Sequence, residues 1–506
     1  MVAIITKKLK KLFIQDLLDQ YNVENIGDSN NYYYIGLSKS QPYNIEIGGT
    51  NSVYDPDPSD WDERSFRMSL QSVKLAEAVS FVVPIETWST NTKYFQYADN
   101  LQQDPRFYVR TNDNNVYVCI RHGKNAVGTH VESTVKPDHT DTTLPIESDG
   151  YVWKYLYTIT TTDANNYLTD TWMPVKYVDS AAATAPEAPQ KAVQDAAIAG
   201  QIIGYRVVAN QAGAAAQYSQ APSLTVVGNG SGATARPIMS ATSGNATIVA
   251  VEVGDSANAG ATGYGSLSTY MGSNYKYANV EVDNTYLVSG AAPTIYPVFA
   301  QDSGMGADPT VDLKTRAIMF NVKPTGTQNS KFVIDQNYKQ IGLIKNPRQY
   351  GSNNLFTNAE GLGLKKLRIS PKPAGAVGDP STGYALTFSD NTLINQTTGT
   401  NAGAKAYLTW YDDSDTLWYH QDEYTGFTPF DSGETITIDG NNDLSTTSIF
   451  GIYNTDTLPA GAGANGYTSF NPDIDNYSGE VLFINNQPAT TRNRLGTEDI
   501  KLVIQL

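Results

Sequence analysis

The chain has 506 residues, which is too long for one simple core, so roughly two to four domains are expected. Its formal net charge of −16 argues against binding nucleic acid through the phosphates, which requires a concentrated positive surface. With 33 tyrosines and 41 glycines, the composition favours strands and turns over helices. A mainly β fold with a few helices in its loops is therefore predicted.

The first region, residues 1–180, is expected to combine strands with two helices. Apolar residues at helical spacing predict a helix over 8–22, and a second helix is predicted over 66–80. Alternating and aromatic stretches predict strands at 32–38, 106–110, 116–121 and 151–159.

The stretch SDGYVWKYLYTI (148–159) has an unusual number of aromatic residues. A turn at Asp149-Gly150 leads into a strand with Tyr151, Trp153 and Tyr155 at alternate positions. The opposite face is largely apolar as well, and successive side chains of a strand point to opposite faces. Both faces of this strand are therefore expected to be covered. The rings could bind a ligand, such as a sugar or base, or hold layers of the fold together.

The amino-acid composition and the expected length of the strands change several times along the remaining chain. Residues 181–204 are alanine-rich and are predicted to form a linker or a short helix. Short strands with Gly and Ala turns predict an inserted β module at 205–310, and longer strands return at 311–374. A polar segment at 375–469, with an aromatic hairpin at 404–420, predicts a small β-barrel or β-sandwich. Two further strands, 480–485 and 499–506, are expected in the last segment, 470–506.

Two groups of side chains contain possible metal ligands. His130 with Glu132 and His139 with Asp141 match no zinc spacing, and a surface loop with incidental histidines is favoured. The acidic loop 54–63 offers the oxygen ligands that calcium prefers, but prolines stiffen it and the glycine of a calcium loop is missing. Asp60 is instead expected to cap the second helix. No metal site and no cofactor are predicted.

Catalytic patterns are weak. Acidic residues at 412–423 lie beside aromatic ones, as in glycosidases, but the tip of a hairpin explains Asp412, Asp413 and Asp415 better. The glycines of GNGSGA (228–233) do not lead from a strand into a helix, so they form no phosphate-binding loop. No catalytic residue is assigned, and the chain is expected not to be an enzyme.

Cys119 is the only cysteine, so no disulfide can form within the chain. It lies in VYVCI (116–120) and is expected to be a small buried hydrophobe. No signal peptide is recognised, and the longest apolar run, from Ala78 to Ile85, is far shorter than the roughly 20 residues that span a bilayer. The compartment of synthesis is therefore expected to be cytosolic or unconstrained, with no secretion by the usual route.

Several of these stretches resemble one known family. SDGYVWKYLYTI resembles a signature of the baseplate wedge subunit of T-even-type myoviruses, the gene product eight family. Other stretches follow in the family's order: YYYIGLSKSQPY (32–43), VVPIETW (82–88), KQIGLIKNP (339–347), YSGEVLFINNQP (477–488) and EDIKLVIQL (498–506). The likeness does not extend over about 205–300 and 375–465, which look like inserted β modules.

The resemblance implies a layered β-sandwich core in the baseplate wedge of a contractile phage tail. It further implies a homodimer that assembles with other wedge proteins in the virion, with no membrane or nucleic-acid partner. The aromatic strand would then be the middle layer of the sandwich. The motif residues expected to serve structure and assembly are Asp149, Gly150, Tyr151, Trp153, Tyr155, Ser478, Gly479 and Glu480.

One alternative is a protein that binds a carbohydrate or receptor on the host surface through its inserted modules. Trp410, Trp418 and Tyr419 would serve as stacking platforms for a host glycan. Hairpins rich in Tyr and Trp suit such a role, but they suit protein interfaces equally well.

Overall fold

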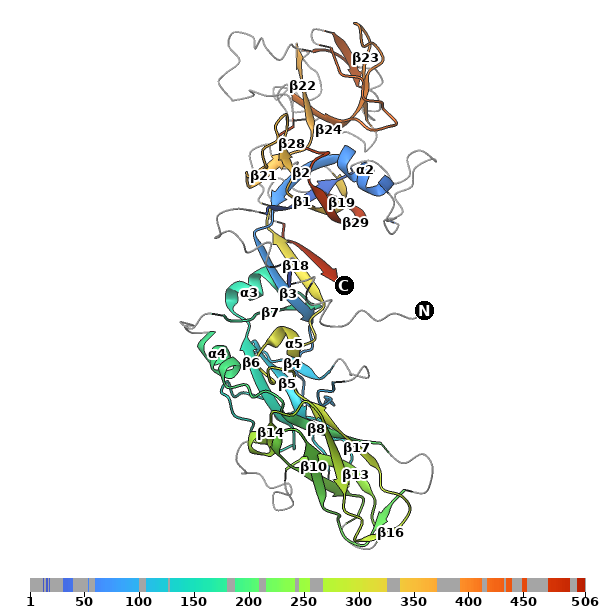
Figure 1. Ribbon diagram of the computed structural model, residues 1–506. Helices are drawn as coiled ribbons and strands as arrows, with labels where there is room; N and C mark the ends of the chain where they lie inside the picture. The colour runs from blue at the N-terminus through green and yellow to red at the C-terminus, as the bar shows by residue number, and fades with distance from the viewer. Residues whose placement is uncertain are drawn as a thin grey trace. The chain divides into compact units, whose positions relative to one another are not determined.

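The computed structural model describes most of the chain, and its elements are nearly all antiparallel β-strands, which confirms the mainly β fold (Figure 1). The described residues are 12, 15–16, 18, 31–39, 53, 60–99, 106–125, 128–179, 187–208, 215–241, 245–254, 267–324, 337–370, 392–411, 416–431, 434–438, 448–452, 472–491 and 498–505. No helix among them is long and apolar enough to cross a membrane.

The chain divides into two compact units. Unit 1 consists of Met1–Ile14, Ser80–Met319 and Gln505–Leu506, and unit 2 of Gln15–Val79 and Phe320–Ile504. The division falls within β3 (Ala78–Pro84) and β18 (Ala317–Val322). This division into two units is coarser than the series of segments predicted from the sequence. The boundaries of those segments therefore stay predictions.

Unit 1 contains a three-stranded sheet of order β4-β5-β6 (Tyr108–Arg110, Asn115–Arg121 and Val152–Thr158). Tyr117 lies opposite Tyr155, and Cys119 lies opposite Trp153. Every residue of β6 except Thr158 is buried, so the prediction of a strand covered on both faces is confirmed. Cys119 is fully buried, as predicted.

Side chains from a loop and a helix cover the ring of Trp153 in β6. Trp153 lies in a buried cluster with Tyr94 from a preceding loop and Val193 from helix α4 (Glu187–Asp195). Helix α4 forms within the alanine-rich stretch, so the short helix is the correct one of the two predictions for that stretch. Trp153 is thus covered by a loop and a helix, whereas the Tyr157 hydroxyl of the same strand donates to the carbonyl of Pro174, which belongs to another sheet.

Other elements of unit 1 are short. β3 pairs with β7 (Trp172–Val175), and Thr160 caps α3 (Thr161–Tyr167). In the glycine-rich region the strand pairs are β8–β17 (Ile202–Val208, Thr294–Phe299), β10–β15 (Leu224–Gly228, Ala278–Val282), β12–β13 (Ala235–Met239, Ile248–Val253), β9–β16 (Gln217–Tyr218, Leu287–Ser289) and β11–β14 (Ser231–Ala233, Met271–Ser273). A 3-10 turn, η3 (Leu267–Tyr270), and helix α5 (Pro309–Asp312) complete the unit.

Unit 2 is built on a five-stranded sheet of order β21-β2-β1-β19-β29. Its strands are Glu360–Leu362, Leu70–Leu75, Tyr33–Ser38, Asn337–Lys345 and Glu480–Thr491. Gly36 lies opposite Gly342, and a side chain at either position would meet the ring of Phe66 from α2 (Asp60–Met68). Glycines in adjacent strands therefore let the helix pack closely on the sheet.

The predicted helix over 66–80 is wrong, because α2 ends at Met68 and strands β2 and β3 follow. Two buried polar side chains of β2, those of Gln71 and Lys74, contact groups far away in the sequence. Lys74, for example, pairs with Glu360 at 3.3 Å. Pairing between distant strands thus overrides the local helical spacing. Of the helix predicted over 8–22, only Leu12, Gln15, Asp16 and Leu18 lie among the described residues, and they are helical.

Six strands of unit 2 pair in a ring to form a closed barrel, which is one of the two alternatives predicted for the 375–469 segment. In ring order they are β22 (Lys365–Ser370), β25 (Thr416–His420), β24 (Lys405–Tyr411), β23 (Leu393–Gln396), β26 (Thr435–Ile438) and β27 (Ser448–Ile452). The barrel includes β22, which precedes the expected start of the module at 375. β24 and β25 are the predicted aromatic hairpin. The remaining strands are β20 (Arg348–Gln349), β28 (Ile474–Asp475) and β30 (Ile500–Gln505).

Candidate functional site

The Asp149-Gly150 turn that opens β6 is fixed by its own carboxylate. Oδ2 of Asp149 accepts hydrogen bonds from the backbone N–H groups of Thr134 (2.7 Å) and Val135 (3.0 Å) and from the Ser133 hydroxyl (3.2 Å). Oδ1 accepts from the N–H of Tyr151 at 3.1 Å. Gly150 has a φ of 81°, which favours glycine. The turn is therefore tied to the segment that runs beside it.

The rings of β6 form a packed aromatic row. Tyr151 stacks on Trp153 at 5.7 Å between centroids, and Tyr94 meets Trp153 edge-on at 5.5 Å. The Tyr151 hydroxyl donates to the carbonyl of Val131 at 2.7 Å, and Tyr155 contacts Tyr117 edge-on at 5.8 Å. Burial raises the pKa of the Tyr151 hydroxyl far above its ordinary value. These rings hold the fold and present no face to a ligand.

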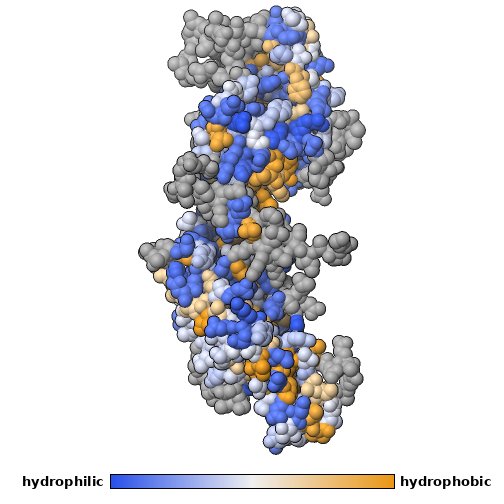
Figure 2. Space-filling model, in the orientation of Figure 1, coloured by the Kyte–Doolittle hydropathy of each residue, from blue (hydrophilic) through white to orange (hydrophobic). Residues whose placement is uncertain are grey.

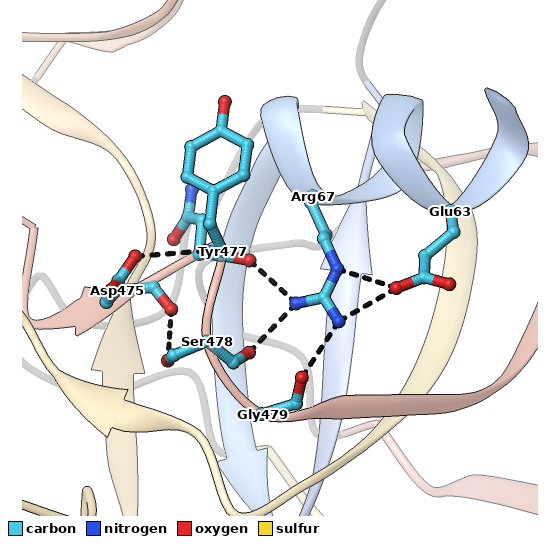
Figure 3. Close-up of polar contacts among 7 residues, drawn as sticks. Glu63, Arg67, Asp475, Tyr477, Ser478 and Gly479 are labelled. Atoms are coloured by element: carbon cyan, nitrogen blue, oxygen red, sulfur yellow. Dashed lines mark hydrogen bonds and ion pairs between the residues drawn. The ribbon is translucent and has the colours of Figure 1, made fainter. Parts of the chain in front are cut away.

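The second group of predicted residues, Ser478, Gly479 and Glu480, belongs to the other unit. Figure 3 shows Arg67 of α2 reaching this turn. The guanidinium donates to the carbonyls of Asn476 (3.0 Å), Ser478 (2.8 Å) and Gly479 (2.9 Å). Its Nε also donates to Glu63 at 2.9 Å. Arg67 thus fixes the backbone of the turn before β29, while Glu480 begins that strand opposite Lys345.

Gly479 is required by this geometry. Its φ is 70°, and a Cβ would lie 2.7 Å from the carbonyl oxygen of Lys345 and 2.9 Å from Cα of Pro347. We expect Gly479→Ala to lower the free energy of unfolding by about 2 kcal/mol or more, through backbone strain and overpacking. Chemical denaturation measures the loss.

Gly351→Ala is the matched control for Gly479→Ala. Gly351 has nearly the same φ, 69°, but a Cβ there would have no atom within 4 Å. The control should lose only about 1 kcal/mol, because the strain of a left-handed alanine remains without the clash. Equal losses in the two variants would contradict the contact at Gly479.

A pocket of about 650 Å³ lies in unit 1, beside the Asp149-Gly150 turn. One wall consists of that turn with Arg121 and Lys124. The other comes from β12 and β13 and includes Arg236 and Glu252. The pocket therefore joins the first predicted segment, 1–180, to the predicted module at 205–310.

Three basic side chains converge on one carboxylate in this pocket. The distances to Glu252 are 2.8 Å from Arg236, 3.2 Å from Lys124 and 3.7 Å from Arg121. Burial acts to raise the pKa of Glu252, but Lys124, Arg121 and Arg236 together outweigh it, so the pKa lies below its ordinary value. The carboxylate is thus stabilised as an anion. We refer to these four residues as the Glu252 cluster.

The histidines predicted to be incidental surface residues are partly buried and packed on rings. The ring of His130 lies 4.3 Å from that of His122, and its Nε2 is hydrogen-bonded to the Tyr151 hydroxyl oxygen at 3.0 Å, while His139 packs on Tyr117. Burial lowers the pKa of His130 and of His139. Within the described part of the chain, no three His, Cys, Asp or Glu side chains are grouped to hold a metal ion.

Several other candidates are corrected or lie outside the described residues. Trp418 is fully buried against Leu362 and Leu364, and Tyr419 is in the barrel core, so neither is a stacking platform. The side chain of Trp410, residues 54–59 and the carboxylates Asp412, Asp413 and Asp415 lie outside the described residues. Helix α2 begins at Asp60, and acidic residues in its first turn suit the helix dipole.

No known family model matches the sequence, and no curated protein is significantly similar to it. The candidate residues that sequence reasoning missed are Arg67 and the Glu252 cluster. The spacing of Glu63 and Arg67, one helical turn apart, was the only local signal. The other contacts join segments far apart in the chain, which periodicity does not connect.

Proposed function

We propose that the chain is a structural subunit of the baseplate wedge of a contractile phage tail. It would form a homodimer, assemble with other wedge proteins in the virion and catalyse no reaction. The order of the family-like motifs along the chain supports this proposal.

One structural observation gives this proposal its strongest support. Three motifs that are far apart in sequence, YYYIGLSKSQPY, KQIGLIKNP and YSGEVLFINNQP, overlap β1, β19 and β29, which are neighbouring strands of one sheet. Motifs spread along a chain are expected to meet in this way if they belong to one common core. The Arg67 contacts lie at the turn that leads into β29.

Exposed aromatic side chains near α2 supply a surface for assembly. Tyr424, Phe427 and Tyr477 are 63%, 52% and 61% exposed. Arg64 of α2 pairs with Glu423 at 3.2 Å, and Arg67 holds the turn that carries Tyr477, so α2 links both aromatic turns. Figure 3 shows the Tyr477 ring pointing away from these contacts. Exposed aromatic residues are enriched at protein interfaces. Figure 2 shows further hydrophobic patches on an otherwise mostly hydrophilic face.

Light scattering of the purified chain is expected to give about twice the 55.0 kDa mass of one copy. A clean monomer at micromolar concentration would contradict the homodimer, and robust hydrolysis of cell-wall polymer would contradict the structural role.

Replacing Tyr424, Phe427 and Tyr477 together with serine tests the assembly surface. We expect the melting temperature to change little, because all three side chains are more than half exposed. Association with the purified wedge proteins of the same phage should be lost in co-sedimentation. The control is Tyr277→Ser, a substitution of an exposed tyrosine in unit 1, which should co-sediment like the unaltered chain.

A further inference from the structure

We propose that the pocket beside the Asp149-Gly150 turn binds a small anionic ligand, one that carries a carboxylate or a phosphate group. This site is additional to the structural role proposed above and does not depend on it. The whole pocket belongs to unit 1, and its walls come from Arg121 and Lys124 on one side and from β12 and β13 on the other.

The balance of charge in the Glu252 cluster is the first argument. Three cations share one carboxylate, and all four side chains are largely withdrawn from water, with exposed fractions of 12% for Arg121, 9% for Lys124, 15% for Arg236 and 7% for Glu252. Placing charge of one sign in a sheltered site is unfavourable unless an opposite charge balances it. An anion in the pocket would supply that balance, in a chain whose net charge is −16.

The second argument concerns the N–H groups of Arg236 and Arg121 that could donate to a ligand. Among the described residues, Arg236 makes its polar contact through one amino group, to Glu252 at 2.8 Å. Arg121 uses Nε to donate to the Gly150 carbonyl at 3.2 Å, and its Nη1 is 3.7 Å from Glu252. A guanidinium has several further N–H donors in one plane, which match carboxylate and phosphate oxygens.

Two other acidic residues, Glu147 and Asp149, line the pocket. The oxygens of Asp149 already accept four hydrogen bonds, from Ser133, Thr134, Val135 and Tyr151. Burial, and then the nearby Asp149 and Asp138, raise the pKa of Glu147 above its ordinary value. Neither carboxylate forms an ion pair with Arg121, Lys124 or Arg236 in the described part of the chain.

The size and lining of the pocket define the ligand further. A volume of about 650 Å³ is in the range of sites for small molecules and exceeds what a lone inorganic ion needs. Polar side chains such as Ser219 and Gln220 line it together with apolar ones such as Ile146 and Met239. A polar molecule with one anionic group, of the size of an acidic monosaccharide or a sugar phosphate, fits this mixture.

Calorimetric titration of the full chain tests the proposal with three probes: glucuronate, glucose 6-phosphate and uncharged glucose. We expect at least one of the two anions to bind and glucose not to bind, at matched ionic strength. The stronger of the two anions identifies the group, carboxylate or phosphate. Arg236→Gln should weaken its binding about tenfold or more, because a charge-assisted contact is lost.

Arg206→Gln is the matched control, because Arg206 lies on β8, outside the pocket, with its guanidinium over the Tyr296 ring. The Arg206→Gln variant should bind the anion with the same affinity as the unaltered chain. Lys124→Gln, which leaves Glu252 paired with two arginines, replaces Arg236→Gln if that variant does not fold. Absence of binding by both anions at millimolar concentration would overturn the proposal, and so would equal losses in the pocket variant and in Arg206→Gln.

Discussion

Replacing Trp153 with alanine is expected to lower the free energy of unfolding by about 3–5 kcal/mol. The indole is fully buried, stacked on Tyr151 and met edge-on by Tyr94. Its removal would leave a cavity between β6 and the loop and helix that cover it, and a rigid sheet closes such a space only in part. Chemical denaturation followed by circular dichroism would measure the loss.

Two companion variants make the Trp153 result specific. Tyr277→Ala removes a large ring that is 67% exposed and should cost less than about 0.5 kcal/mol. Trp153→Phe keeps an aromatic ring in the cluster and should cost less than the alanine variant. A Trp153→Ala protein that unfolds at the same denaturant concentration as the unaltered chain would show that the ring is not part of the core.

Replacing Arg67 with alanine is expected to cost about 3 kcal/mol. The guanidinium satisfies three backbone carbonyls of the turn that leads into β29 and is itself paired with Glu63. Its side chain is only 11% exposed, so water would replace these contacts incompletely. Because β29 pairs with β19, loosening of the turn should also increase hydrogen exchange along that edge of the sheet.

The same helix provides the control for Arg67. Arg64→Ala removes another arginine of α2, whose side chain is 51% exposed and pairs with Glu423, and should cost at most about 1 kcal/mol. Arg67→Lys keeps the charge but lacks the planar guanidinium with its several N–H donors. It should therefore be more stable than Arg67→Ala but less stable than the unaltered chain. If Arg64→Ala were as destabilising as Arg67→Ala, the three carbonyl contacts would not be the cause.

Local sequence patterns predicted those parts of the fold that depend on neighbouring residues. Alternation in β1, β5 and β6 gave strands at the right places, and the burial of Cys119 followed from its apolar neighbours. The closed barrel agrees with the short strands and polar turns of its segment.

The failures have a common physical origin, which is pairing over long distances in the chain. The segment 66–80 has helical spacing, yet strand partners such as Glu360 decide its structure. Trp418 looked available to a sugar because nothing near it in sequence indicates that Leu362 and Leu364 cover it. In the same way, Arg121 and Glu252 come from separate segments, so no local motif predicts their meeting.

The sheet of unit 2 has a consequence for the order in which the protein folds during synthesis. The first strand, β1, pairs with β19, and the Tyr34 hydroxyl donates to the carbonyl of Phe356, 322 residues further along the chain. Residues 80–319 of unit 1, by contrast, form one continuous stretch. Domains fold as units while the chain emerges from the ribosome, and strands without partners aggregate readily. One edge of the segment Tyr33–Ser38 can pair early with β2, but its other edge must wait for β19 while all of 80–319 is made. That unpaired edge is a site where chaperones are expected to bind the nascent chain.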